Sequence, residues 1–174
     1  RVFPFIDAAD LAAANGSAVV RGNLIRGTTG AGVLVDGGVY ATQYLNNTII
    51  GGTGDGVSLI EQSQNVTLNS NIITASGAGN AALRAASTAQ RGFNADYNLY
   101  FAGSGADAVH WQRAFNSVAA WWQESGFDRH GIMADPMFMN PAGSDYSLST
   151  GSPAHFAADP AGVVRNTGAF EDTF

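Results

Sequence analysis

The sequence repeats itself over its first hundred residues, and this repeat restricts the possible folds more than any other feature. An asparagine followed by two strand-forming residues occurs four times, at spacings of 24, 24 and 27 residues. The copies are Asn23-Leu24-Ile25, Asn47-Thr48-Ile49, Asn71-Ile72-Ile73 and Asn98-Leu99-Tyr100. Self-similarity at a short fixed period is the signature of a solenoid, in which each repeat stacks on the next.

The composition of each repeat indicates strands and not helices. Each unit offers three short runs of aliphatic or β-branched residues separated by Gly, Asn, Ser and Thr, and no unit contains a ten-residue helical pattern. Three strands per turn, each lying about 4.8 Å from its copy, define a parallel β-helix. We therefore predict an all-β fold, a three-sheet solenoid of about four to five coils over residues 1–105. Strand alternation should point Val57 and Leu59 inward and Ser58 and Ile60 outward.

The repeated asparagines have a structural explanation. Asparagine tolerates the left-handed backbone conformation of a tight corner. Stacked asparagine side chains can also hydrogen-bond from one coil to the next, because each amide both donates and accepts. We interpret Asn23, Asn47, Asn71 and Asn98 as scaffold and not as ligand contacts.

The period is lost after Gly105, where apolar residues recur at spacings near three and four, at Val109, Trp111, Phe115, Val118, Trp121 and Trp122. This pattern predicts an amphipathic helix within residues 106–125, with Asp107 or Asn116-Ser117 as start signals and Gly126 as the stop. The rest reads as an irregular tail with short strands around Phe138 and Tyr146. Residues 106–174 are thus expected to be a C-terminal helix and a capping tail packed on the solenoid.

Composition excludes several classes of function. The net charge of −6 argues against nucleic acid as a partner. The absence of cysteine excludes thiol catalysis, disulfides and thiolate metal sites. No run of 18 apolar residues is present, so we expect no membrane span.

The start of the sequence suggests an incomplete coil. Counting back one repeat from Val33 and Val35 reaches Ala9 and Leu11, so residues 6–11 match a strand of an earlier coil. The asparagine that belongs to that coil would lie before residue 1. We therefore expect upstream coils or another chain to cover the N-terminal end, because exposed strand edges promote unwanted pairing. The alternative is that residues 2–5 fold over and form a cap.

Several segments resemble one family. The repeats Gly56-Val57-Ser58-Leu59 and Asn65-Val66-Thr67-Leu68-Asn69-Ser70-Asn71-Ile72-Ile73 look like its coils. The tail matches its C-terminal closure in Asp96-Tyr97-Asn98-Leu99-Tyr100, Gly126-Phe127-Asp128-Arg129-His130, Ala134-Asp135-Pro136-Met137-Phe138, Asp145-Tyr146-Ser147-Leu148, Gly151-Ser152-Pro153-Ala154 and Gly168-Ala169-Phe170-Glu171. Over residues 17–171 the chain resembles the C-terminal part of right-handed parallel β-helix proteins of the pectate-lyase-like class.

The resemblance implies a polysaccharide partner and a secreted or periplasmic location. It does not imply one reaction, because the class includes lyases, hydrolases, epimerases and non-catalytic proteins. It also implies that the substrate groove lies on the outer face of the sheet that contains residues 33–36, 57–60 and 81–84. The first hypothesis is a polysaccharide-active enzyme whose main active site lies upstream or in a companion chain. The alternative is a non-catalytic surface, adhesion or assembly module.

The best candidate catalytic set is Asp36, Asp55, Glu61 and Arg84. The repeat predicts Asp36 and Arg84 in one outward column two coils apart, about 9.6 Å. Arg84 could then hold a substrate carboxylate while Asp36 or Glu61 acted as the base. The alternative is that the two aspartates belong to ordinary Asp-Gly turns and that Glu61 and Arg84 are solvated charges.

Other polar residues lie outside this set. Calcium bound by Asp7, Asp10 or Asp55 is conceivable, although no loop signature supports it. Asp128 and His130 are expected to be hydrogen-bonding partners that fix the tail, and the alternative is an acid/base pair.

Overall fold

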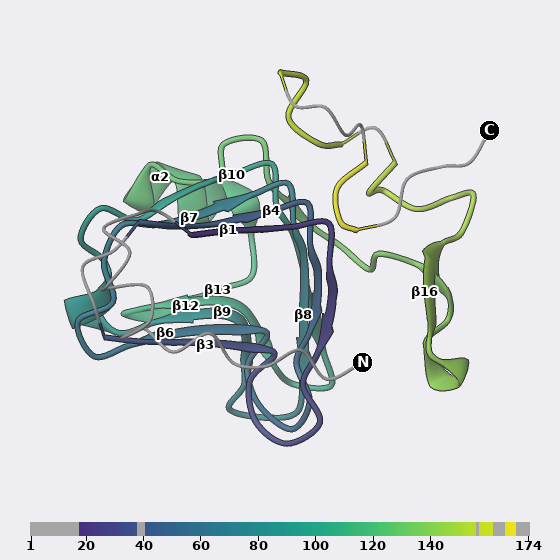
Figure 1. Cartoon of the computed structure of the whole chain (residues 1–174), viewed down its shortest axis with the longest axis horizontal. Helices are drawn as coiled ribbons and strands as arrows, with labels where there is room; N and C mark the ends of the chain where they lie inside the picture. The colour runs from purple at the N-terminus through teal and green to yellow at the C-terminus, as the bar shows by residue number, and fades with distance from the viewer. Residues whose placement is uncertain (1–17, 38–40, 156, 162–165, 170–174) are drawn as a thin grey trace.

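Three sheets built from parallel strands form the sides of the molecule, and the chain passes through each sheet in turn (Figure 1). The computed structural model describes residues 18–37, 41–155, 157–161 and 166–169. Sheet A contains β1 (Ala18–Arg21), β4 (Thr42–Leu45), β7 (Val66–Asn69) and β10 (Asn94–Asp96). Sheet B contains β2 (Leu24–Arg26), β5 (Thr48–Ile50), β8 (Ile72–Ser76), β11 (Leu99–Gly103) and β14 (Ile132–Met133). Sheet C contains β3 (Val33–Asp36), β6 (Val57–Ile60), β9 (Ala81–Ala85), β12 (Asp107–Trp111) and β13 (Arg113–Phe115).

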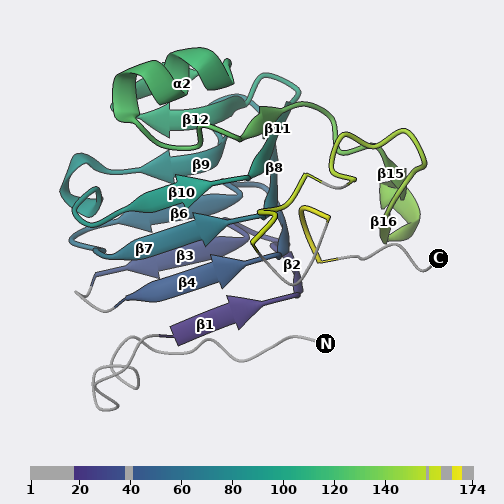
Figure 2. The ribbon, with the colours of Figure 1, turned by 90° about the horizontal axis from the view of Figure 1, so that it is seen from above.

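The strand register confirms a β-helix with three strands in each coil. Thr42 lies beside both Ala18 and Val66, and the neighbouring strands are parallel. Figure 2 shows the successive coils stacked from β1 upward. From β1 to β12 the neighbouring strands of each sheet are three elements apart in strand number, so each of these coils supplies one strand to each sheet.

Inward-facing side chains fill the solenoid in continuous columns. In sheet B, Ile25 lies beside Ile49, Ile49 beside Ile73, and Ile73 beside Tyr100. The last three are buried in the core. Val57 and Leu59 are fully buried core residues, as predicted from strand alternation.

The predicted asparagine ladder exists, and it runs the length of the solenoid at the corner between sheets A and B. The Nδ2 atom of each asparagine donates to Oδ1 of the next, at 3.2, 3.1 and 3.0 Å in turn from Asn23 to Asn98. The backbone N–H of each lower asparagine donates to the same oxygen. A second hydrogen of Nδ2 reaches a sheet A carbonyl, as in Asn71 to Tyr44 at 2.8 Å. The ladder therefore satisfies buried polar groups that would otherwise be costly.

The left-handed corner residue is not the ladder asparagine, which corrects our expectation. Positive φ angles occur one residue earlier, at Gly22 (66°), Asn46 (52°), Ser70 (58°) and Tyr97 (60°). The preceding residue makes the turn, and this leaves the asparagine side chain free to enter the interior.

The predicted helix over residues 106–125 is wrong in its first half. Asp107–Trp111 forms β12, which extends sheet C in parallel with β9, and Arg113–Phe115 returns antiparallel as β13. The helix α2 covers only Val118–Ser125. Of the start signals considered, Ser117 is the N-cap, and Gly126 ends the helix with φ of 78°.

Aromatic side chains close the C-terminal end of the solenoid beneath α2. Trp121 is fully buried and contacts the rings of Trp111, Phe115 and Phe127, while Phe93 packs against Trp111 and Phe127. Figure 2 shows α2 lying across the last coil. Trp121, Phe115 and Phe93 thus belong to the core, whereas Trp122 is exposed.

The C-terminal tail covers the outer face of sheet B. The predicted short strands are present as the antiparallel pair β15 (Phe138–Asn140) and β16 (Asp145–Leu148). Ile72 and Leu99 point out of sheet B and are buried under Ala154, Phe138 and Leu148. Two single-turn helices, η1 (Ser87–Ala89) and η2 (Pro141–Gly143), complete the described elements.

The last described residues cross several coils beside the ladder. The backbone N–H of Gly168 donates to the carbonyl of Ser70 at 2.8 Å, and that of Ala169 donates to Oγ1 of Thr48 at 3.0 Å. The N–H of Asp159 donates to Oγ of Ser70 at 3.0 Å. Residues 157–161 and 166–169 thus form a strap, named the C-terminal strap below.

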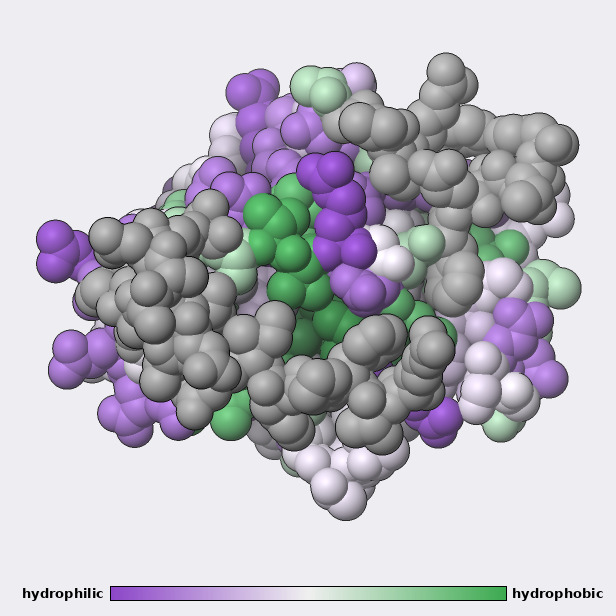
Figure 3. All heavy atoms as spheres, in the orientation of Figure 1, coloured by the Kyte–Doolittle hydropathy of each residue, from purple (hydrophilic) through white to green (hydrophobic). Residues whose placement is uncertain are grey.

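The N-terminal end of the solenoid presents apolar side chains. In Figure 3, hydrophobic residues gather at the centre of the view down the coils. Val20, Ile25, Val33 and Val35 are only partly buried, whereas their partners in the next coil are buried. The outward-facing Val19, Leu24 and Leu34 are also exposed. The proposed strand at residues 6–11 and the alternative cap at residues 2–5 lie outside the described residues.

Candidate functional site

The outer face of sheet C carries an unbroken column of side chains from successive coils. The register places Leu34 beside Ser58, Ser58 beside Arg84, and Arg84 beside His110. Neighbouring strands are about 4.8 Å apart. The lower half of this column is small or apolar and the upper half is basic, so the polar chemistry of this face is concentrated on β9 and β12.

Two aspartates stand at the edge where these strands begin. Asp55 lies two residues before Val57, and Asp107 lies two residues before Val109. Val57 and Val109 both lie beside Leu83, so the two aspartates occupy equivalent positions on either side of Ala81. A carboxylate therefore accompanies each basic side chain.

Asp55 and Arg84 form an ion pair that joins two neighbouring coils. Nε of Arg84 lies 2.9 Å from Oδ2 and 3.1 Å from Oδ1 of Asp55. The backbone N–H of Ala81 donates to Oδ1 at 2.7 Å, and Arg84 also donates to the carbonyl of Gly79. The Asp55 side chain is 12% exposed and that of Arg84 is 28% exposed, so the pair is screened less than one in free solution. Both side chains are held in place before any ligand arrives.

Asp107 and His110 form the second pair. Oδ2 of Asp107 lies 3.2 Å from Nδ1 of His110, and both side chains are about one-third exposed. A carboxylate at Nδ1 orients the imidazole and favours the tautomer in which Nε2 can accept a proton. This pair is not among the site residues predicted from the sequence. The signal was an aspartate and a histidine separated by three residues, which we assigned to a helix.

The structure separates the other two predicted site residues from Arg84. Asp36 lies beside Ile60, one residue before Glu61, at the opposite end of the strands from Asp55. The expectation that Asp36 and Arg84 share a column is wrong, because Arg84 lies beside Ser58. The chain between equivalent positions of sheets B and C is two residues longer in this coil, because nine positions separate Thr74 from Leu83 whereas seven separate their partners Ile50 and Val57, and this moves β9 by two residues. Of the four candidates, the structure brings together Asp55 and Arg84.

Metal ligands are not clustered in the described part of the chain. No group of three or more histidine, aspartate or glutamate side chains there could hold a metal ion. Asp55 is engaged by Arg84, and Asp7 and Asp10 lie outside the described residues.

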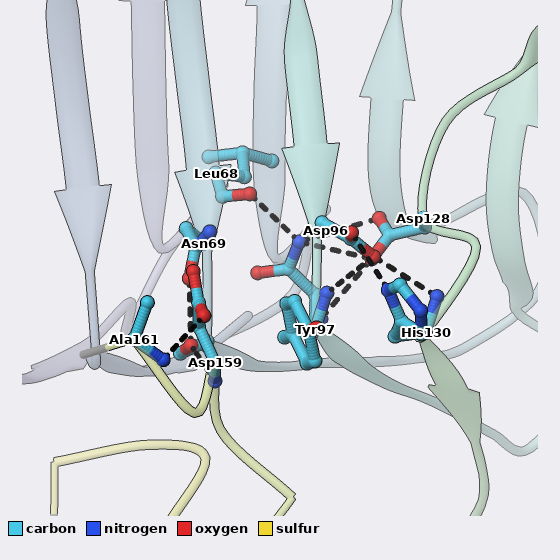
Figure 4. Close-up of polar contacts among 10 residues, drawn as sticks. Leu68, Asn69, Asp96, Tyr97, Asp128, His130, Asp159 and Ala161 are labelled. Carbon is cyan, nitrogen blue, oxygen red and sulfur yellow. Dashed lines mark hydrogen bonds and ion pairs between the residues drawn. The ribbon is translucent and has the colours of Figure 1, made fainter.

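A second polar cluster surrounds the end of the asparagine ladder (Figure 4). Asp96 accepts hydrogen bonds from the N–H groups of Tyr97 and His130 at 3.0 and 2.9 Å, and Nδ1 of His130 lies 2.9 Å from its other oxygen. The His130 ring stacks on Tyr97 with centroids 4.6 Å apart. Asp128 bonds instead to Asn98 and Tyr100. Asp128 and His130 thus both fix the tail, but through different partners.

The stacked parallel strands and the internal amide ladder define the molecule as a parallel β-helix. A family model described as a right-handed beta helix region matches residues 10–103, and the chain belongs to this family. No curated protein and no solved structure matches the chain. Among the described residues, no helix is long and apolar enough to cross a membrane.

Proposed function

We propose that this chain is part of a polysaccharide-active β-helix protein and that the carbohydrate lies across the outer face of sheet C. The observation that carries the proposal is the alignment of Arg84 and His110 on neighbouring strands, each oriented by an aspartate. A polymer that crosses the strands meets one coil after another, so equivalent positions on successive coils can contact successive sugars. Export to the periplasm or the exterior follows from such a substrate.

The residues at this face fit an acidic sugar better than a neutral one. The Arg84 guanidinium presents further N–H donors beyond those bound by Asp55 and Gly79, and guanidinium groups bind carboxylates in matched geometry. His110 can accept a proton through Nε2 while Asp107 stabilises the resulting cation. This combination supports proton removal beside a sugar carboxylate, the first step of lyase or epimerase chemistry, with Arg84 stabilising the charge that develops.

A non-catalytic carbohydrate-binding module is the second candidate. Arg84 is already neutralised by Asp55, and the same column continues into the exposed Leu34, which contributes no acid or base. This arrangement favours binding without turnover. The other predicted partner, upstream coils or another chain that covers the N-terminal end, is proposed for either candidate, because Val20, Ile25 and Val33 are only partly buried there whereas their partners in the next coil are buried.

The test is binding and turnover with uronate-containing and neutral polysaccharides. We expect the chain to bind an acidic polymer in affinity electrophoresis and Arg84→Met to weaken that binding at least about tenfold, since a charge-assisted hydrogen bond contributes about 1.5–3 kcal/mol. Arg21→Met is the matched control, because Arg21 is exposed on sheet A. Equal binding by the two variants, or no binding to any polymer, rules out this face as the carbohydrate site.

Turnover separates the enzyme from the binding module. Formation of unsaturated uronate, followed by ultraviolet absorbance, should be lost in His110→Gln and retained in His130→Gln. Binding of the same polymer without unsaturated product, new reducing ends or epimerised sugar supports the non-catalytic candidate.

A further inference from the structure

The asparagine ladder ends on a buried carboxyl group instead of a fifth amide. Asp128 is 1% exposed, and its Oδ1 accepts the backbone N–H of Asn98 at 3.1 Å and the side-chain amide at 3.2 Å. Its Oδ2 lies 3.2 Å from the same amide and accepts the hydroxyl of Tyr100. Figure 4 shows the carboxyl group facing this corner from the turn that follows α2. The side chain thus occupies the position that the next asparagine of the ladder would have filled.

The carboxyl group sits where the last coil is attached to the solenoid. The N–H of Asp128 donates to the carbonyl of Ala95 at 2.8 Å, and the N–H of Ile132 donates to the carbonyl of Asn98 at 2.8 Å. Asp128 therefore lies between α2, which caps the end, and β14, which completes sheet B. A change in the interactions of the Asp128 side chain therefore alters how tightly the segment from α2 to β14 is held on the solenoid.

Burial and hydrogen bonding shift the pKa of Asp128 in opposite directions. Removal from water raises the pKa of Asp128 to about 6, although the hydrogen bonds from Tyr100 and Asn98 lower it. The negative charge of Asp96 on β10 raises it slightly. The other ionisable groups nearby are His130, which is bonded to Asp96, and Arg129, whose guanidinium lies over the Trp122 ring. Burial is the larger effect, so the pKa of Asp128 is raised.

We propose that Asp128 is a proton-linked latch on the last coil, such that the protonated side chain holds the segment from α2 to β14 more tightly than the carboxylate does. The protonated form is neutral and avoids the cost of a buried charge, and it still accepts the amide of Asn98. The carboxylate keeps the hydrogen bonds but stays desolvated. Docking of the segment and protonation of Asp128 therefore favour each other, as linkage requires.

The direction of the pH effect follows from the sign of the shift. The pKa of Asp128 is raised in the folded protein from its ordinary value of 3.8 to about 6. The stabilisation is fully present below the ordinary value and is lost as the pH rises through about 6. For these two values, the equilibrium constant for docking falls roughly tenfold between about pH 5 and about pH 8.

Nuclear magnetic resonance of the intact chain tests the proposal. The carboxyl carbon of Asp128 and the amide proton of Asn98 should titrate together near pH 6, and this measurement needs no variant. The amide of Ile132 should be protected from hydrogen exchange roughly tenfold more at about pH 5 than at about pH 8, after correction for intrinsic rates. In Asp128→Asn, which keeps the size and an acceptor oxygen, the pH dependence of that protection should vanish.

His130→Gln separates the latch from the neighbouring histidine. This variant should keep the titration of Asn98 and the pH dependence at Ile132. The proposal is overturned if Asp128 titrates near its ordinary value, if protection of Ile132 does not change with pH, or if His130→Gln removes the pH dependence and Asp128→Asn retains it.

Discussion

The side-chain amide of Asn71 donates to Oδ1 of Asn98 at 3.0 Å, although the two residues are 27 positions apart in the chain. The same amide donates to the carbonyl of Tyr44, and Asn71 itself accepts from Asn47. One fully buried side chain thus connects three coils. The ladder is a set of mutually dependent hydrogen bonds, and its members should be far less replaceable than surface asparagines.

Replacing Asn71 by alanine should lower the free energy of unfolding by about 2–4 kcal/mol. The change leaves the N–H and amide of Asn47 and the carbonyl of Tyr44 without their buried partners, and each unsatisfied group costs about 1–3 kcal/mol. Urea denaturation measures the change. Asn94→Ala, at an exposed position of β10, is the control and should cost less than about 0.5 kcal/mol. Equal costs would contradict a structural role for the ladder.

The pair of Asp55 and Arg84 should contribute to stability as a unit. Arg84→Met leaves a mostly buried carboxylate with only the Ala81 N–H, so we expect a loss of about 1–3 kcal/mol. Adding Asp55→Asn should restore part of that loss, and a double-mutant cycle measures the coupling. Arg113→Met breaks an exposed pair with Glu124 and should cost less than about 1 kcal/mol. The absence of coupling in the cycle would show that the two side chains do not act together.

The stability of the aromatic cap should depend strongly on Trp121 and only weakly on Trp122. Trp121→Ala empties a fully buried position and should cost about 3–5 kcal/mol. Trp122→Ala removes a side chain that is 39% exposed and should cost less than about 1.5 kcal/mol. Within the described residues, the indole N–H of Trp121 has no hydrogen-bond partner, so Trp121→Phe should be milder than Trp121→Ala. Thermal unfolding followed by near-ultraviolet circular dichroism ranks the three variants, and any other order rejects this account of the cap.

Tyr100→Phe should move the pH dependence of stability upward. The Tyr100 hydroxyl lowers the pKa of Asp128, so its removal raises that pKa above about 6. Because stability is lost as the pH rises through the folded pKa, the midpoint of the loss should shift to higher pH. Unfolding free energies measured from about pH 4 to about pH 9 locate the midpoint. An unchanged or lower midpoint would mean that the hydroxyl does not act on this carboxyl.

The repeat predicted the regular coils well because their side-chain period is uniform. The spacing of Asn23, Asn47 and Asn71 is reproduced in the strand register of all three sheets in the early coils. The prediction failed where the chain gains two residues between Thr74 and Leu83 relative to the previous coil. Leu83 lies beside Val57 and not beside Leu59, and either alignment buries an aliphatic residue, so hydrophobic pattern alone could not locate the insertion.

The C-terminal coil shows why periodicity can mislead. Trp111 and Phe115 are four residues apart, as on one face of a helix, but they lie on a strand and on the strand that turns back along it. The antiparallel return produces helical spacing by coincidence. Asp128 could not be recognised as the end of the ladder, because it is a different residue type, 30 positions from Asn98, and its carboxyl group enters from a turn.

The C-terminal strap has a consequence for biosynthesis. Gly168 and Ala169 bond to Ser70 and Thr48, which lie 98 and 121 residues upstream (168−70 and 169−48). Ile72 and Leu99 are buried by the hairpin and by Ala154. Synthesis proceeds from the N-terminus, so the middle coils emerge from the ribosome long before the segments that cover them. The apolar outer face of sheet B therefore stays uncovered by these segments until they have been synthesised, and during that interval the nascent chain is open to capture by chaperones or to aggregation.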